Sequence, residues 1–472
     1  MDSKPTVFQS LLPIGTLFSS LLAGALFWGF SNALLICALL LAAAVAGLIA
    51  VIHGHGWEEI QKETGAKLAG ALPAIIILLA IGVLVGSWMF SGTIPLMVYY
   101  GIEFVSPRFI VLTAFLATAA MSLASGTSWG SAGTIGVALM ATAAAIEAPL
   151  AMTAGAIVSG AYFGDKMSPL SDSTNISAIG AGADLYDHIG SMIYTATPSF
   201  IVAFSVYLIV GISLGGVETA SIPESARATQ TEIAAIFSLG GFALVPPLIA
   251  VIGMVKRYPA ALVIVVSSVA ALAVGVFANG FGGKEAVTVF VNGFDVSMAG
   301  PEAGTAIREA TKSLLNRGGM ASMATTLLFI ISAFMMAAAL EVSGATQTLL
   351  DALLKRVRST FSLIAATMAA GATLISMTSH GGVTALIVGN LFRKSFRERE
   401  LAPENLSRSI EDSVTIVEPL LPWTVSAVFM ATTLGVPTFS YAPWAIFCFL
   451  GPVFSLLYAA TFDQTGFGLK TK

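Results

Sequence analysis

A stretch of twelve residues concentrates the side chains that could do chemistry in an otherwise apolar chain. Residues 164–175 read Gly-Asp-Lys-Met-Ser-Pro-Leu-Ser-Asp-Ser-Thr-Asn and hold two carboxylates, four hydroxyls, an amide, an ammonium and a proline. A charged side chain at the centre of a bilayer costs about 2.5–3.5 kcal/mol. These charged groups must therefore have partners or line water. The proline also breaks a helix and frees backbone carbonyls.

The two carboxylates of this stretch, Asp165 and Asp172, are the main candidates for binding an ion. Hard oxygen atoms are the ligands that an alkali cation prefers, and a proton competes for the same carboxylate oxygens. We predict that Na+ binds at Asp165 and Asp172 and that the same groups exchange protons. The expected neutral ligands are Ser168, Ser171, Thr174 and Asn175. The structural alternatives are a local Asp165–Lys166 ion pair and a cap of the following helix formed by Ser171-Asp172-Ser173.

A second polar stretch lies about 250 residues further along the chain. Its candidates for ion or proton binding are Glu411, Asp412, Ser413 and, deeper in the apolar run, Glu418. Glu411 and Asp412 have a second interpretation, in which they only pair with Arg408 at the membrane edge. The sequence leaves both interpretations open.

Two Thr-Ser pairs interrupt long apolar runs next to glycines, which let backbones approach closely. They are Thr127-Ser128 and Thr378-Ser379, the second followed by His380. We expect these residues to lie at the tips of two interrupted segments and to close the ion site. His380 carries either a proton or a hydrogen bond that bridges two loops.

Composition places the chain in a membrane. Of its 472 residues, 56% are hydrophobic and only 10% are charged, whereas a soluble domain carries about 25% charged residues. The mean hydropathy is +0.88. A net charge of -4 argues against nucleic-acid partners, which call for a basic patch. Cys37 and Cys448 lie in apolar runs and form no disulfide framework.

Apolar runs long enough for membrane spans recur along the whole chain. They cover residues 8–28, 33–52, 68–89, 108–146, 149–178, 190–214, 231–252, 258–280, 320–343, 359–392, 405–436 and 440–462. Three runs, 108–146, 359–392 and 405–436, are too long for one straight span, and 149–178 contains charges. Such runs are typical of the helix pairs or re-entrant hairpins that line transporter cavities. We predict an all-α polytopic membrane protein with about 10–14 transmembrane segments.

A weak internal repeat relates the two halves of the chain. GTSWG at 126–130 recurs as MTSHG at 377–381, and SPL at 168–170 recurs as EPL at 418–420, both about 250 residues later. Each half makes an odd number of crossings by our count, so the copies should lie upside down relative to each other. Inverted repeats with broken helices are the architecture of secondary transporters. Chance recurrence of small-residue motifs is the alternative.

Loop charges orient the chain. Four basic loops belong in the cytoplasm by the positive-inside rule: Lys62 and Lys67; Lys256 and Arg257; Lys355, Arg356 and Arg358; and Arg393, Lys394, Arg397 and Arg399. The segment 281–318, which includes the acidic Glu302, then falls outside. Both termini are expected in the cytoplasm, and the two repeats should occupy residues 1–215 and 216–472.

These motifs resemble the NhaC-type Na+/H+ antiporter family, a branch of the ion transporter superfamily. The resemblance rests on GTSWGSAGTIG at 126–136, GDKMSPLSDSTN at 164–175, and LSRSIEDS at 406–413 with PLLPW at 419–423, and it runs over nearly the whole chain. It implies a bacterial or archaeal inner-membrane protein that exchanges cytoplasmic Na+ for external protons. The family also contains members that move organic acids or amino acids.

The chain departs from the family pattern in its second half. His380-Gly381 stand where many members have an Asp-Gln pair, and Val414 and Glu418 stand where they have Gly and Ser or Thr. Relative to the family pattern, an acidic residue is thus lost at His380-Gly381 and gained at Glu418. This difference is compatible with a different transported solute.

Our primary hypothesis is a secondary active antiporter that exchanges cytoplasmic Na+ (or Li+) for external H+ by alternating access. The alternative is Na+- or H+-coupled transport or exchange of a small organic acid or amino acid, held by helix N-termini. An intramembrane aspartyl protease would need a Gly-x-Gly-Asp turn, but Tyr162 occupies the first glycine position, so no enzyme is expected. The expected partners are Na+, H+ or a small solute and the lipid bilayer, with a homodimer as one option and no cofactor.

Overall fold

The computed structural model describes residues 4–29, 31–213, 223–256, 258–300, 307–354 and 357–471. Four charged residues named above, Arg257, Glu302, Lys355 and Arg356, lie outside these ranges, as does the expected repeat boundary at residue 215. The described residues form helices and connections, and their β-pairing is limited to one isolated bridge. The all-α prediction is confirmed.

Within the described ranges, nine helices are long and apolar enough to cross a bilayer. They are α1 (Val7–Trp28), α2 (Asn32–Ile52), α4 (Leu72–Phe90), α6 (Ile110–Ser125, with the preceding turn from Pro107), α11 (Leu185–Ser213), α14 (Ala260–Ala278), α18 (Ala324–Val342, with the preceding turn from Met320), α20 (Thr360–Thr378) and α25 (Ile446–Thr465). Two bent helix pairs, with angles of 103° and 45°, raise the number to eleven if each is one span. This number agrees with the predicted 10–14 segments.

The bent pairs and shorter elements connect or interrupt these spans. The first pair is α12 (Glu224–Ile236) with α13 (Val245–Val255), and the second is α22 (Pro403–Ile410), with the turns η7 (Glu411–Thr415) and η8 (Glu418–Leu420), followed by α23 (Val425–Leu434). The others are α3 (Trp57–Gly70), α5 (Thr93–Phe104), α7 (Ser128–Ser131), the π-helical turn η2 (Ala132–Gly136), α8 (Val137–Ala145), α9 (Leu150–Met167), α10 (Asp172–Ala181), α15 (Gly283–Asn292), α17 (Glu309–Leu315), α19 (Ala345–Leu354), α21 (Gly381–Glu398) and α24 (Thr438–Tyr441).

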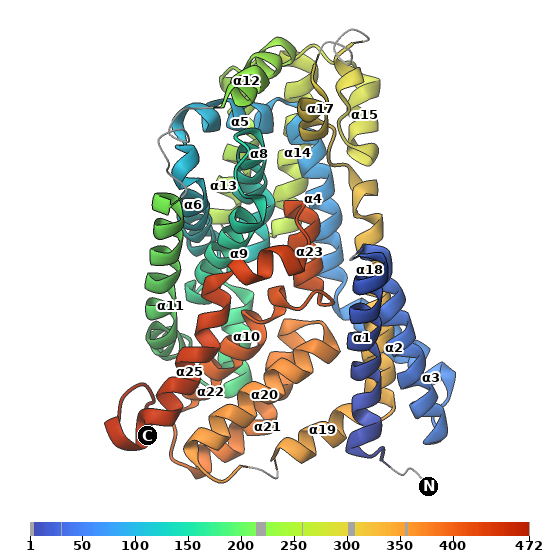
Figure 1. Ribbon diagram of the computed structural model, residues 1–472, viewed down its shortest axis with the longest axis vertical. Helices are drawn as coiled ribbons and strands as arrows, with labels where there is room; N and C mark the ends of the chain where they lie inside the picture. The colour runs from blue at the N-terminus through green and yellow to red at the C-terminus, as the bar shows by residue number, and fades with distance from the viewer. Residues whose placement is uncertain are drawn as a thin grey trace.

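The long apolar runs fold as hairpins and broken helices. The run 108–146 becomes α6 followed by α7, η2 and α8, and the run 359–392 becomes α20 and α21. Figure 1 shows α20 and α21 in the half of the molecule that carries both termini, whereas α6 and α8 lie in the other half. The runs 149–178 and 405–436 break into α9 with α10, and α22 with α23. The predicted helix breaks are therefore present.

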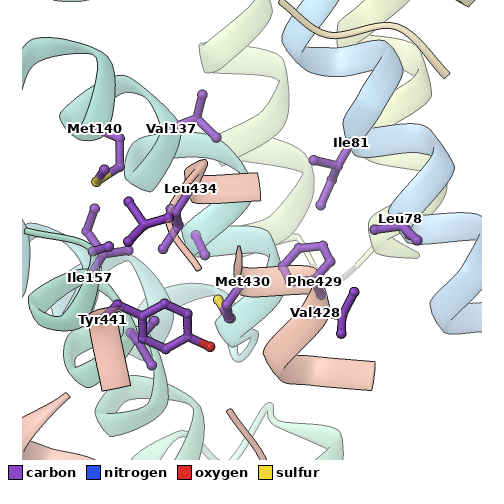
Figure 2. Packing of buried hydrophobic residues seen from close by; sticks show 14 of the residues in the cluster. Leu78, Ile81, Val137, Met140, Ile157, Val428, Phe429, Met430, Leu434 and Tyr441 are labelled. Carbon is purple, nitrogen blue, oxygen red and sulfur yellow. The ribbon is translucent and has the colours of Figure 1, made fainter. Parts of the chain in front are cut away.

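Small side chains let the helices pack closely. In α2, Ala38, Ala42, Ala46 and Ala50 follow one another at every fourth position and are fully buried, and this helix packs against α1 and α18. Such stripes are the usual helix contact in a bilayer, where lipid tails are as apolar as leucine. Larger apolar side chains fill the centre between α4, α8, α9 and α23, as Figure 2 shows.

Candidate functional site

The tips of the two hairpins have the same backbone form. α6 ends at Gly126, which has a left-handed φ of 70°, and Thr127 is extended and caps α7 with its side chain. α20 ends at Ser379 with φ 57°, and His380 is extended and caps α21. A left-handed residue followed by an extended N-cap therefore makes each tip, and the two tips are separated by 253 residues, from 126 to 379.

The two broken helices repeat at the same interval. α10 begins after the N-cap Ser171, and α23 begins after the N-cap Thr424. Each break contains a proline two residues earlier, Pro169 and Pro422. The interval from 171 to 424 is again 253, so the same register holds at the tips and at the breaks.

The 253-residue interval corrects the alignment of the two halves that the sequence motifs suggested. Matching letters paired Thr127 with Thr378, but the backbone pairs Thr127 with His380. The error has a physical cause, because small hydroxyl residues suit both sides of a tip. In the first hairpin the Thr-Ser pair begins the second helix, and in the second hairpin it ends the first one.

A cavity of about 420 Å³ lies between the tips and the breaks. Seven pairs of its wall residues are separated by 253 positions: Thr127 and His380, Ser128 and Gly381, Trp129 and Gly382, Tyr162 and Thr415, Asp165 and Glu418, Asp172 and Val425, and Ser173 and Ser426. Part of the remaining wall comes from the start of α4. The fold thus places equivalent positions of the two halves around one space.

Asp165 faces this cavity with both carboxylate oxygens hydrogen-bonded. Its Oδ2 accepts from the Ser128 hydroxyl at 2.7 Å, and its Oδ1 accepts from the Ser171 hydroxyl at 2.6 Å. Ser128 is the first residue of the continuous helix α7–η2–α8, and Ser171 is the N-cap of α10. Two helix N-termini therefore stabilise negative charge on Asp165.

Glu418 occupies the equivalent place in the second half. Its carboxylate lies against Gly381, the first residue of α21, where an added Cβ would stand 2.6 Å from Oε2. The Ser426 side chain, in the first turn of α23, faces the same carboxylate. Glu418 is 9% exposed and Asp165 8%, and both line the cavity.

Three predicted neutral ligands are directed at the backbone of the break instead of the cavity. The Thr174 hydroxyl donates to two carbonyls at the end of α9, at 3.1 Å each. The Asn175 amide donates to carbonyls in the break at 3.1 and 2.7 Å. Ser168 accepts from an amide of its own turn. Thr174 and Asn175 thus donate to backbone carbonyls at the break and Ser168 accepts from a backbone amide there, so the three side chains hold the end of α9 that carries Asp165.

Three second-half candidates also lie off the cavity wall. The hydroxyls of Thr378 and Thr384 are hydrogen-bonded at 2.5 Å. Ser379 donates to the carbonyl of Trp423 at 3.2 Å, and Ser413 donates to a carbonyl one turn earlier at 2.7 Å. The structure thus brings Thr127, Ser128, Asp165, Asp172, His380 and Glu418 to the cavity, with Ser171 bonded to Asp165.

Comparison with known proteins agrees with this arrangement. The sequence model of the Na+/H+ antiporter family matches residues 160–461. The chain is 41% identical to an uncharacterized Na+/H+ antiporter of Haemophilus influenzae over 423 residues, which make up 90% of each chain. It is 32% identical to the Na+/H+ antiporter NhaC of Alkalihalophilus pseudofirmus, over 97% of this chain and 96% of the relative.

The chain belongs to the Na+/H+ antiporter family. It is accordingly a multi-pass membrane protein. A relative from Bacillus subtilis, 28% identical over 97% of this chain and 95% of its own, is a malate-2H+/Na+-lactate antiporter.

In this family member, Lys166 turns away from the cavity. It forms an ion pair with Asp412 of η7, and both side chains are fully buried. Asp412 also accepts from the hydroxyls of Thr195 at 3.3 Å and Ser455 at 2.7 Å. The local Asp165–Lys166 pair considered from the sequence is therefore absent, because the ammonium finds its carboxylate 246 positions away in the chain.

Glu411 and Asp412 make their direct hydrogen bonds and ion pair with residues other than Arg408. Glu411 is fully buried, and its Oε1 accepts from the Ser177 hydroxyl at 2.8 Å while Oε2 has no partner. Arg408 is itself buried and donates to the backbone carbonyls of Ser191 and Gly468. Glu411 therefore lies directly behind Ser177, which lines the antiporter cavity.

Sequence reasoning missed several wall residues, chiefly Tyr162, Trp129, Thr415 and Ser426. The repeat in its corrected register would have found one of them, since Ser426 is equivalent to Ser173 of the first polar stretch. Within the described residues, no group of three or more His, Cys, Asp or Glu side chains could hold a metal ion.

Proposed function

We propose that this family member is a secondary active Na+/H+ antiporter, in which Asp165 and Glu418 bind Na+ and H+ in turn. Asp172 is exposed and lines the same cavity, so its negative charge attracts a cation that enters the cavity. The two halves are inverted repeats, and alternating access exposes the cavity first to one side and then to the other. Cytoplasmic Na+ (or Li+) leaves the cell as external H+ enters, across an inner membrane with both termini in the cytoplasm.

One observation carries this proposal: two buried carboxylates face one cavity whose described wall holds no lysine or arginine. The nearest candidate in sequence, Lys166, is neutralised by Asp412 outside the wall. A space with two carboxylates and hydroxyl oxygens attracts a cation or protons. Because a bound cation and a proton use the same oxygens, occupancy by one excludes the other, which is the requirement for exchange.

The charge of the cavity also argues against an organic acid as the solute. A volume of about 420 Å³ would admit a small carboxylic acid, but no lysine or arginine on the described wall would pair with its carboxylate. We therefore favour Na+ and H+ as the transported species, as cargo and not as cofactors, and we assign no enzymatic reaction. A homodimer remains a prediction from the sequence.

The proposal is tested in everted membrane vesicles whose respiration-driven pH gradient is followed with a pH-sensitive dye. We expect addition of NaCl or LiCl to dissipate the gradient, and potassium or choline chloride at equal concentration not to do so. A variant at the exposed Asp187, Asp187→Asn, serves as the matched control and should behave as the unaltered chain. The absence of a response to Na+ and Li+ from about pH 7 to about pH 9 would refute the assignment. Thermal stabilisation by carboxylic or amino acids would support the organic solute instead.

A further inference from the structure

A second polar space lies on the other side of the apolar centre. Two adjoining hollows of about 320 and 440 Å³ share Ser322, Thr432 and Gly435 in their walls, and we call them together the Thr432 vestibule. Its wall reaches Asp295 and Arg317, between α15 and α18. Figure 1 shows α15 and α17 at the end of the molecule opposite both termini. The vestibule thus extends toward that end.

The helix α23 runs from the cavity to the vestibule. Ser426, in its first turn, lines the cavity, and Thr432 and Thr433, two turns later, line the vestibule. Phe429 lies between them and is 1% exposed. The Thr433 hydroxyl is buried and has no hydrogen-bond partner in the described structure. A single apolar turn of α23 therefore separates two polar spaces.

The helix α4 also carries, in sequence, a cavity residue, a buried apolar residue and a vestibule residue. Ile77 lines the cavity, Val85 lines the vestibule, and Ile81 between them is fully buried. Residues four apart lie on the same face of a helix, so the three form one stripe. Ile81 packs against Gly133 of η2, where an added Cβ would stand 2.7 Å from Ile81 Cδ1. Figure 2 shows Ile81 of α4 near Phe429 of α23.

An aromatic stack completes the apolar layer. The ring of Trp129, in α7, is stacked on the ring of Phe429 with centroids 4.2 Å apart and an interplanar angle of 8°. Trp129 lines the cavity, and Val137, two turns along the same continuous helix, lines the vestibule. The layer of Ile81, Trp129 and Phe429, which we call the aromatic layer, thus joins three elements between the two spaces.

The positions equivalent to Trp129 and Phe429 carry no aromatic side chains. The 253-residue register relates Trp129 to Gly382 and Phe429 to Ile176. These two residues also meet, since an added Cβ on Gly382 would stand 3.3 Å from Ile176 Cδ1, and both line the cavity. A stacked aromatic pair therefore stands between the cavity and the vestibule, whereas the equivalent Gly–Ile contact forms part of the cavity wall.

We propose that the aromatic layer is the gate between the cavity and the Thr432 vestibule, and that the vestibule is the route by which the cation leaves the site at the end opposite the termini. This inference rests on the proposed function, because a carrier needs an exit on each side of its site. The polar wall of the vestibule supplies oxygen atoms for a partly hydrated cation. The stack of Trp129 on Phe429 must separate before the exit opens.

Cysteine accessibility tests the gate without requiring transport. In a background with Cys37→Ser and Cys448→Ala, single cysteines are introduced at Ser426, at Thr433 and, as a marker of the terminal end, at the exposed Glu398. A membrane-impermeant thiol reagent is then applied to vesicles of each orientation. We expect Glu398→Cys and Ser426→Cys to react from the terminal side only, and Thr433→Cys from the opposite side only.

Removal of the ring should open the layer. In Phe429→Ala, we expect Ser426→Cys to react from both sides, with the rate from the opposite side raised by about two- to tenfold by loss of the stack. Phe429→Leu keeps an apolar side chain and should give a smaller increase, so the test does not depend on the alanine variant alone. Phe115→Ala, which removes an equally buried ring from the Phe115–Phe200 pair, is the control and should leave labelling one-sided.

Labelling distinguishes failure of the gate from failure of the Na+ assignment. Thr433→Cys that reacts from the terminal side, or one-sided labelling of Ser426→Cys in both Phe429 variants, overturns the gate. Correct labelling in a chain that does not respond to Na+ supports the gate and overturns the assigned ion instead.

Discussion

Asp165 and Glu418 stand 253 positions apart in the chain, and both carboxylates line the same cavity of about 420 Å³. Each lies against the first residue of the second helix of a hairpin, Ser128 in one half and Gly381 in the other. The two contacts differ in chemistry, since Ser128 donates a hydroxyl and Gly381 offers only backbone. The site is therefore symmetric in position and asymmetric in its ligands.

Loss of either carboxylate should weaken Na+ binding strongly. For Asp165→Asn and Glu418→Gln, we expect the apparent Na+ affinity to fall at least about thirtyfold, since removing one partner of a buried charge interaction costs about 2 kcal/mol or more. The measurement is the Na+ concentration that half-dissipates the pH gradient in everted vesicles. Asp187→Asn is the control, because Asp187 is exposed at the start of α11. Unaltered Na+ response in both carboxylate variants would remove these residues from the site.

Replacing Gly381 with alanine should weaken the contribution of the Glu418 carboxylate to Na+ binding. The added Cβ would stand 2.6 Å from Glu418 Oε2, so the carboxylate must move away from the N-terminus of α21. We expect about a tenfold loss of Na+ affinity, or about 1.4 kcal/mol, with folding retained. Gly190→Ala is the matched control, since no atom lies within 4 Å of the added Cβ. Equal Na+ affinities in the two variants would contradict this role for Gly381.

The buried Lys166–Asp412 pair should hold the two halves together without binding the ion. Lys166→Met leaves Asp412 charged and buried, which is expected to cost about 3–5 kcal/mol of stability. The double variant Lys166→Met/Asp412→Leu removes both charges and should recover a large part of this loss. Thermal unfolding of the purified chain in detergent measures both. A double variant as unstable as the sum of the two single ones would show that the pair is not coupled.

Na+ binding should release protons. Because Na+ replaces H+ on the carboxylates, the apparent Na+ affinity should rise with pH while they carry protons, by about tenfold per pH unit for each proton released. Calorimetric titration with Na+ in two buffers of different ionisation enthalpy gives the number of protons released. Asp165→Asn should release fewer protons than the unaltered chain. A value of zero in the unaltered chain would contradict direct competition.

The sequence predicted the type of fold well for a simple reason. Only helices satisfy their own backbone groups in lipid, so runs of apolar residues had to become helices, and runs too long for one span, such as 359–392, had to break or turn back. The glycines, serines and prolines inside those runs indicated where the helices break or turn back. Single letters could not fix the register of the repeat, because Thr-Ser suits either side of a tip, and only the φ angles at Gly126 and Ser379 decided it.

The scarcity of charge in the sequence identified the candidate site residues. Placing a charged side chain in a membrane costs free energy, so such a side chain must either function there or have a partner. Asp165, Lys166, Asp172 and Glu418 were identifiable on that ground alone, whereas Asp412 kept two interpretations. Only the tertiary structure decided which of them faces the cavity and which is neutralised. Lys166 follows Asp165 directly in the chain, but at the end of α9 the carboxylate turns to Ser128 and Ser171 and the ammonium turns to Asp412. Neighbours on a helix point in different directions, and only packing against the other half determines what each one meets.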